Sequence, residues 1–348
     1  MKKALYFILK RFLVTAIVLF VVLLVTISIL GSTMDKILED SIRYKINEDL
    51  TQQKIKFLNS ADLSNYIENQ LAVYKNSLGL NEPWYSPIRI LNTMYKIVSL
   101  DLGQSYSINS ESGSSKVIDI IVEKIPRTLI LFTTSTIIII ILGMYGGAFI
   151  ANKVGSIFDK LSYVFTIFGN SFPTWWIGIL MLFIFAFLFP IFPTRSTPST
   201  SSTESSYFLD VIYHLLLPII TIIIANLGSL IYIVRHFVIN ELEEDYIKAK
   251  KAMGISTRKI IYSHALKNAA PPILTLSILS LTNSLGGAIT VEVVFDWPGI
   301  GKLFYDAVQN NESSIVLGLT YIFTLIFILS IFVIDIAYTF FDPRIKVG

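Results

Sequence analysis

The reactive side chains of this 348-residue chain form no recognisable catalytic or metal-binding pattern in the sequence. Cysteine is absent, and His214, His236 and His264 show neither an H-E-x-x-H pattern nor any other paired spacing. The segment 297-WPGIGKL comes nearest to a phosphate-binding loop, but it lacks the first glycine at the required spacing and the Ser or Thr after Lys302. We therefore predict no catalytic residue and no metal ligand, and we interpret 297-WPGIGKL as a Pro-Gly turn.

Long apolar runs make up most of the chain. Hydrophobic residues make up 53% of the chain and charged residues 15%, and the mean hydropathy is +0.64, outside the balance of ordinary soluble domains. A bilayer core requires about 20 mostly apolar residues per helix. Six runs reach this length: 12–30, 129–150, 161–189, 209–234, 269–294 and 315–341. The pattern predicts an all-α integral membrane protein with six transmembrane helices, the third kinked near Pro173.

The charges beside these runs predict the orientation of the chain. With the N-terminus inside the cell, 15 Lys and Arg residues lie in the inner segments and two lie in the short outer loops. Both termini are then cytoplasmic. The first run could instead be a secretory signal peptide, but its 19 apolar residues exceed the roughly 7 to 15 of such a segment, which favours a retained anchor. The net charge of +3, without basic residues interleaved with aromatics, excludes nucleic acid as a partner.

The same assignment divides the chain into three parts. Residues 1–31 form the cytoplasmic N-terminus and the first transmembrane helix. Residues 32–127 form an extracytoplasmic cap, which the apolar spacing predicts to be mainly helical. Residues 128–348 form a core of five transmembrane helices, with a cytoplasmic loop at 235–268.

This cytoplasmic loop has the pattern of helix, turn and helix. Acidic residues open its first helix and lysines close it, which complements the helix dipole. Gly254 stands where a left-handed C-cap is needed, and Ser256 suits the N-cap of the next helix. An apolar stripe on the first helix requires a groove in a partner protein or a membrane surface, and it consists of Leu242, Tyr246, Ala249 and Met253.

The loop resembles the ATPase-docking loop of ABC importer permeases. Ala249, Gly254 and Leu266 match the general E-A-A-x3-G-x9-I-x-L-P pattern, while lysines replace the glutamate and second alanine. The match is stronger to the dipeptide, oligopeptide and nickel permease family, and it runs in register from E-D-Y-I at 244 to H-A-L-K-N-A ending at 269. Further blocks of this family follow one another along the whole chain: D-L-G at 101, I-P-R-T-L at 125, S-F-P-T-W-W-I-G at 171, G-G-A-I-T-V-E-V-V-F-D-W-P-G-I-G-K at 286 and F-D-P-R at 341.

The resemblance implies a permease core of the type I ABC importer, without catalytic activity, in the cell membrane of a bacterium or archaeon. Its partners would be a second homologous permease subunit, two ATPase subunits, identical or different, that bind ATP and magnesium, and an extracytoplasmic solute-binding protein. The ATPase-coupling residues would be Glu244, Asp245, Tyr246, Ala249, Ala252, Met253, Gly254, Ile255 and Ser256.

The cargo implied by the resemblance is a small peptide, with an oligosaccharide or nickel as alternatives. The translocation path would run along polar faces of the later spans, although small polar residues also hold transmembrane helices together. The candidate path residues are Asn170, Ser171, Thr282, Asn283 and Glu292, and the last of these could belong to an outer gate.

Two rival classes follow from the membrane pattern. A stand-alone secondary transporter predicts inverted repeats and charges near the middle of spans, and the sequence shows neither clearly. A membrane-anchored sensor that uses the cap leaves five further spans unexplained.

Overall fold

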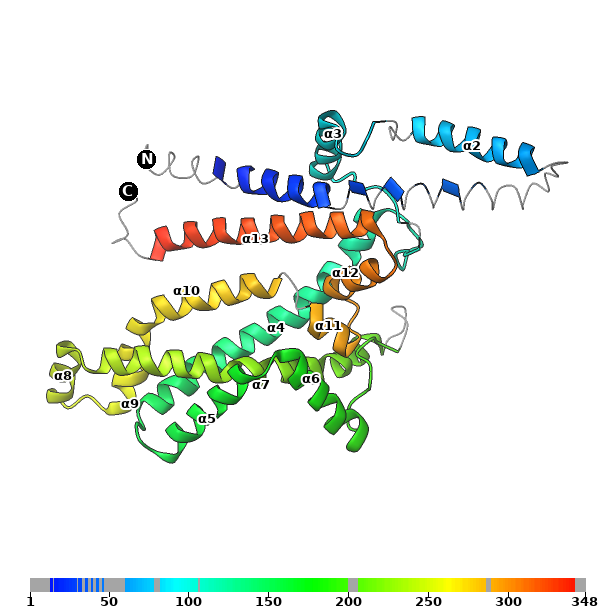
Figure 1. Ribbon diagram of the computed structural model, residues 1–348. Coiled ribbons are helices and arrows are strands. Elements are labelled where there is room, and N and C mark those ends of the chain that lie inside the picture. The colour runs from blue at the N-terminus through cyan, green and yellow to red at the C-terminus, as the bar shows by residue number, and fades with distance from the viewer. Residues whose placement is uncertain are drawn as a thin grey trace. The chain divides into compact units, whose positions relative to one another are not determined.

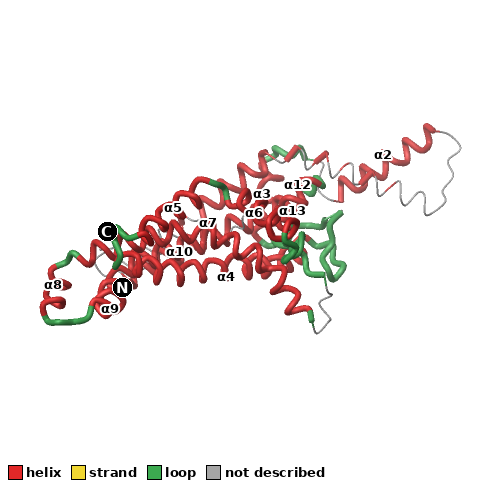
Figure 2. Tube along the Cα trace, turned by 90° about the horizontal axis from the view of Figure 1, so that it is seen from below, coloured by secondary structure: helices red, strands yellow, loops and turns green. Residues whose placement is uncertain are grey.

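The structure is a computed structural model that describes residues 13–341, apart from 15, 30, 33–34, 37–38, 40–41, 44–45, 47–59, 78–81, 106, 200–205 and 286–288. Within these residues the secondary structure is helical, except for one isolated bridge between Gln104 and Lys116 (Figures 1 and 2). The chain divides into two compact units, Met1–Glu123 with Phe304–Leu325, and Lys124–Leu303 with Ile326–Gly348. We describe each unit by itself.

The first unit contains an apolar helix, Ala16–Ile29, and the helices α2 (Ser60–Ser77) and α3 (Pro87–Val98). Pro87 begins α3 because its fixed φ suits the first helical turn and it lacks an N–H group that would go unpaired there. The loop after α3 is held by Glu312, whose Oε1 accepts hydrogen bonds from the hydroxyls of Ser105 at 3.0 Å and Ser107 at 2.8 Å. Helix α13 (Ser313–Phe341) begins directly after this residue.

In the second unit, glycines bring long helices into close contact. Helix α4 (Val117–Ala151), whose residues from Lys124 onward belong to this unit, packs against α7 (Tyr207–Leu242), and a Cβ on Gly147 would lie 2.6 Å from Cβ of Val234. On another face of α7, Gly228 lies so close to Thr166 that an added Cβ would be 2.8 Å from its Cα. Small residues allow the backbones of membrane helices to approach in this way.

The third predicted span is not one kinked helix. Helix α5 (Ile157–Ser171) ends at a break, and α6 (Thr174–Leu182) with the π-helix η1 (Phe183–Leu188) leaves at 100°. Phe172 and Pro173 have extended backbone angles, since the residue before a proline disfavours helix and the proline cannot donate to one. The expected kink is therefore a break that makes this pair a broken span or a re-entrant loop.

The fifth predicted span includes most of one helix and nearly all of another. Helix α10 (Leu266–Leu285) ends before residues 286–288, which lie outside the described part, and α11 (Ile289–Phe295) and α12 (Ile300–Gln309) follow. Among the described residues, α4 and α7 are long and apolar enough to cross a membrane, and the bent pair makes a third candidate if it forms one span. Ala16–Ile29 and Ser313–Leu329 are shorter apolar helices, so a total of six spans stays a prediction.

Candidate functional site

The connection between α7 and α10 carries most of the predicted site. It forms α8 (Asp245–Ala252), the short α9 (Thr257–Lys259) and the π-helix η2 (Ile260–Ala265). Both views show α8 and α9 where α7 and α10 come together (Figures 1 and 2). Asp245 lies in the first turn of α8, and Lys250 and Lys251 lie in the last, so the charges complement the helix dipole as predicted.

Gly254 ends α8 in the conformation that the sequence predicts. Its φ is +79°, in the left-handed region. Its N–H group donates to the carbonyl of Lys251 at 3.0 Å, and the N–H of Ile255 donates to the carbonyl of Lys250 at 3.2 Å, which is the pair of bonds of a Schellman cap. Ser256 has the extended angles of an N-cap, although its side chain makes no capping hydrogen bond.

The inner side of α8 is attached to its own chain. The Ile247 side chain is 0% exposed, and it belongs to an apolar cluster with Val238 of α7, Ile260 of η2, and residues at the ends of α4 and α10. The Tyr246 hydroxyl donates to Glu241 and accepts from Asn268 Nδ2 at 2.7 Å. These contacts join α8 to α4, α7 and α10.

Two titratable groups take part in this attachment. Burial, reinforced by the hydrogen bond to Glu241, raises the pKa of Tyr246 to about 12. Loss of hydration, reinforced by Lys250, Lys259 and Lys267, lowers the pKa of His264, and Nζ of Lys250 lies 2.8 Å from His264 Nδ1. The histidine is thus neutral at pH 7 and accepts a hydrogen bond from the lysine.

The exposed residues of α8 are not the same as those of the apolar stripe predicted from the sequence. Leu242 and Tyr246 are half-buried against their own chain, whereas Ala249, Ala252 and Met253 are exposed, Met253 at 69%. Ile247, which anchors the helix, was not among the predicted site residues. Its signal in the sequence is that it is the one isoleucine in a helix rich in charged residues.

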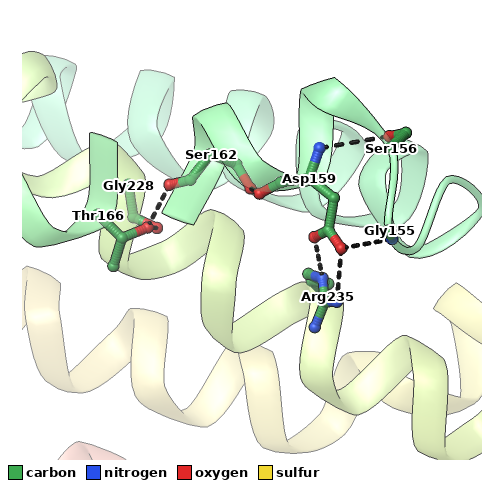
Figure 3. A network of polar contacts seen from close by, with 7 residues as sticks. All are labelled: Gly155, Ser156, Asp159, Ser162, Thr166, Gly228 and Arg235. Atoms are coloured by element: carbon green, nitrogen blue, oxygen red, sulfur yellow. Dashed lines mark hydrogen bonds and ion pairs between the residues drawn. The ribbon is translucent and has the colours of Figure 1, made fainter. Parts of the chain in front are cut away.

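An ion pair at the same end of the second unit joins α5 to α7 (Figure 3). Arg235 donates twice to Asp159, from Nε to Oδ1 at 2.6 Å and from Nη2 to Oδ2 at 2.9 Å. The N–H of Gly155 donates to the same carboxylate at 2.8 Å, and Ser156 caps α5. Further along α5, the Thr166 hydroxyl lies 2.8 Å from the Gly228 carbonyl of α7. The network fixes the start of α5 on the helix that leads into α8.

Neutralising Asp159 is expected to destabilise the protein in a pH-dependent way. The hydrogen bonds from Arg235 lower its pKa, so its stabilisation is complete above the unfolded pKa of about 3.9 and is lost as the pH falls through the lower folded pKa. Asp159→Asn should cost about 1.5–3 kcal/mol at pH 7 and progressively less below about pH 4. Thermal unfolding of the purified protein across this range measures the difference. Asp245→Asn, whose exposed pair with Lys248 contributes little, is the control, and equal losses for both variants contradict the prediction.

A second polar site surrounds Glu292, which is 0% exposed. Its Oε1 accepts from the Thr128 hydroxyl at 2.6 Å, and its Oε2 accepts from the N–H of Lys302 at 2.9 Å. The N–H of Ile300 in turn donates to the Thr128 oxygen at 2.8 Å. The carboxyl group therefore lies at the N-terminus of α12, where free N–H groups and the helix dipole favour an acceptor.

The segment 297-WPGIGKL thus holds the chain's own carboxyl group. A Cβ on Gly299 would lie 2.3 Å from Glu292 Oε1, so only glycine allows this approach. Trp297 is buried, and its Nε1 donates to the carbonyl of Arg127 at 3.0 Å. These contacts agree with the interpretation of the segment as a Pro-Gly turn.

The structure describes the side chains of three of the five predicted path residues. Asn170 and Ser171 are exposed at the break after α5, and Asn170 Oδ1 accepts from the Ser229 hydroxyl at 2.5 Å. The side chains of Thr282 and Asn283 lie outside the described residues. Glu292 is buried between α4 and the start of α12. In the described part of the chain, no group of three His, Cys, Asp or Glu residues could hold a metal ion.

Residues 139–347 match the family of binding-protein-dependent transport system inner membrane components. This match covers more than half of the chain, so the chain belongs to that family, and the family predicted from the sequence is confirmed. It is accordingly an integral membrane, non-catalytic component of a transport system.

The individual relatives are peptide permeases. The oligopeptide transport system permease protein AppB of Bacillus subtilis is 29% identical over 292 residues, which cover 83% of this chain and 86% of that protein. The dipeptide transport system permease protein DppB of Alkalihalophilus pseudofirmus is 31% identical, over 79% of this chain and 86% of its own. The protein DppB of Escherichia coli is 28% identical, over 77% and 83%.

Proposed function

We propose that this chain is one of two permease subunits of an ATP-driven importer and that α8 couples it to a separate ATPase. The observation that carries the proposal is the two-sided character of α8. Its inner side is joined through Ile247 to a cluster that reaches α4, α7 and α10, while Ala249, Ala252 and Met253 remain exposed on the other. A helix attached in this way transmits a push from a docked partner to the membrane helices.

The peptide names of the relatives support a small peptide as cargo. The two permeases, each with six spans, would share one translocation path. Two ATPases that bind ATP and magnesium, and an extracytoplasmic solute-binding protein, would complete the importer. Asn170 and Ser171, at the break after α5, are the described residues that we propose for the path. Binding assays on the cognate solute-binding protein with peptides, oligosaccharides and nickel decide the cargo, and binding of an oligosaccharide alone refutes the peptide assignment.

Co-purification tests the coupling role. The intact chain should isolate with a second permease and an ATPase pair, whereas a lone chain that transports refutes the importer and favours a secondary transporter. Because the Met253 side chain is 69% exposed, Met253→Asp should leave thermal stability within about 0.5 kcal/mol of the parent and reduce the amount of ATPase recovered. Met253→Leu, which retains an apolar side chain, should recover it fully. Equal recovery for the aspartate variant contradicts docking on this side of α8.

The proposed orientation places α8 in the cytoplasm and the loop at 99–116 outside. The chain contains no cysteine, so a label found on the chain isolated from a single-cysteine variant reports one position. In intact cells a membrane-impermeant maleimide should label Ser112→Cys, and it should label Lys251→Cys only after the membrane is opened. Labelling of Lys251→Cys in intact cells would indicate the opposite orientation, in which α8 is not on the side of the membrane that holds ATP.

A further inference from the structure

Helix α3 exposes an apolar stripe that no transport role has yet explained. Leu91 is 57% exposed and Tyr95 75%, and Ile88 and Val98 are exposed as well. The spacing of these residues places them on one side of an α-helix. The polar side of α3 lies about a third of a turn from the stripe and carries Arg89, Asn92, Thr93 and Lys96.

The helix is nevertheless firmly attached to its own unit. Met94 and Ile97 lie next to the stripe on the helix circumference, and both are buried. Apolar residues therefore cover a continuous arc of α3, of which one part packs on the protein and the other is exposed. An exposed apolar surface of this kind on a folded helix indicates an interaction site.

The attachment of α3 places it beside the end of the first apolar helix. The Trp84 ring, three residues before α3, packs on Gly31, where an added Cβ would lie 2.5 Å from it. Gly31 directly follows the apolar run 12–30. Nη1 of Arg89 donates to Asp35 at 2.9 Å, a few residues further along the chain. Within the first unit, α3 runs across the direction of helix Ala16–Ile29 (Figure 1).

We propose that α3 lies in the lipid–water interface, with its stripe in the acyl-chain boundary and its polar side toward water. The direction of α3 is that of a helix in the membrane plane, if the first apolar helix crosses the bilayer. Amphipathic helices with cations opposite an apolar side bind membrane surfaces in this way. Trp84, Tyr85 and Tyr95 are of the residue types enriched at that depth. The proposal rests on the family's membrane location and not on the coupling role of α8.

An interfacial α3 has a consequence for the segment that follows it. Residues 99–116 leave α3 directly, and the hydroxyls of Ser105 and Ser107 bind Glu312 at the start of α13. A helix held at the height of the bilayer surface therefore fixes this loop at the same level. The lipid contact would thereby position the start of α13.

Spin labels on single cysteines test the proposal in the full complex, reconstituted into phosphatidylcholine–phosphatidylglycerol vesicles. Labels at Leu91→Cys and Tyr95→Cys should collide readily with oxygen and poorly with a water-soluble nickel chelate. A label at Asn92→Cys, one residue from Leu91 on the polar side, should collide readily with the chelate. This pattern should not depend on the solute-binding protein.

Three results would overturn the proposal. A Leu91 label as accessible to the chelate as the Asn92 label places the stripe in water. Exclusion of the chelate only after the solute-binding protein is added assigns the stripe to that protein. Exclusion of both reagents assigns it to a protein surface in the complex. None of these outcomes bears on ATPase docking, so failure here leaves the proposed function intact.

Discussion

Replacing Gly254 by valine is expected to reduce uptake by about 5- to 30-fold while the protein still inserts and folds. The residue has a φ of +79°, and a Cβ at this position would meet no atom within 4 Å, so the substitution creates no clash. Its cost is conformational, about 1–2 kcal/mol for a side chain in the left-handed region. This lowers the ratio of capped to uncapped loop by about 5- to 30-fold, and uptake should fall by the same factor if only the capped loop couples. The strain weakens the cap that sets the direction of the chain leaving α8.

Gly254→Asn is the matched control, because asparagine tolerates the left-handed region better than other residues with a side chain. Reconstituted complexes should show near-normal uptake for the asparagine variant and reduced uptake per ATP hydrolysed for the valine variant. ATP hydrolysis itself should persist, since this chain belongs to a non-catalytic component. Normal uptake in the valine variant, with normal recovery of the ATPase, would refute the assignment of α8 as the coupling element.

Local features of the 235–268 loop and of the segment 297-WPGIGKL could be predicted from the sequence because neighbouring residues determine them. The acidic start and basic end of α8, the left-handed Gly254 and the turn at 297-WPGIGKL all depend on a few adjacent residues. The membrane character could also be predicted from the sequence, since it depends on the length and composition of the apolar runs.

Features that depend on distant residues were not predicted. Asp159 forms an ion pair with Arg235, which is 76 residues away in the sequence, and Thr128 donates a hydrogen bond to Glu292, which is 164 residues away. Neither partner is marked by its neighbours, and no periodicity in the sequence reports such a pairing. The exposure of the apolar residues on α8 was not predicted for the same reason. The packing of α8 on η2 buries Ile247 and leaves Met253 exposed. The 100° break after α5 also exceeds what a proline alone implies.

Gly299→Ala is expected to destabilise the protein by several kcal/mol, the largest stability effect of the substitutions considered. The added Cβ would lie 2.3 Å from Glu292 Oε1 and 2.4 Å from Thr128 Oγ1, far inside contact distance. Overpacking of this kind costs about 1–3 kcal/mol, and displacing the buried carboxyl group from its donors adds about 1.5–3 kcal/mol. Gly146→Ala is the control, because its Cβ would meet Ile231 at an ordinary 3.4 Å and should be neutral or slightly stabilising.

A double-mutant cycle distinguishes a structural carboxyl group from one that acts in transport. If Glu292 clashes with the new Cβ, then Gly299→Ala should cost at least about 1 kcal/mol less in a Glu292→Ala background, as measured by unfolding of the purified protein. Additive losses would mean that the glycine serves another purpose. Glu292→Gln nearly preserves the shape of the side chain and should destabilise less than Glu292→Ala. If it instead assembles normally but abolishes uptake, the carboxyl group belongs to an outer gate; if uptake survives, Glu292 holds the start of α12 in place.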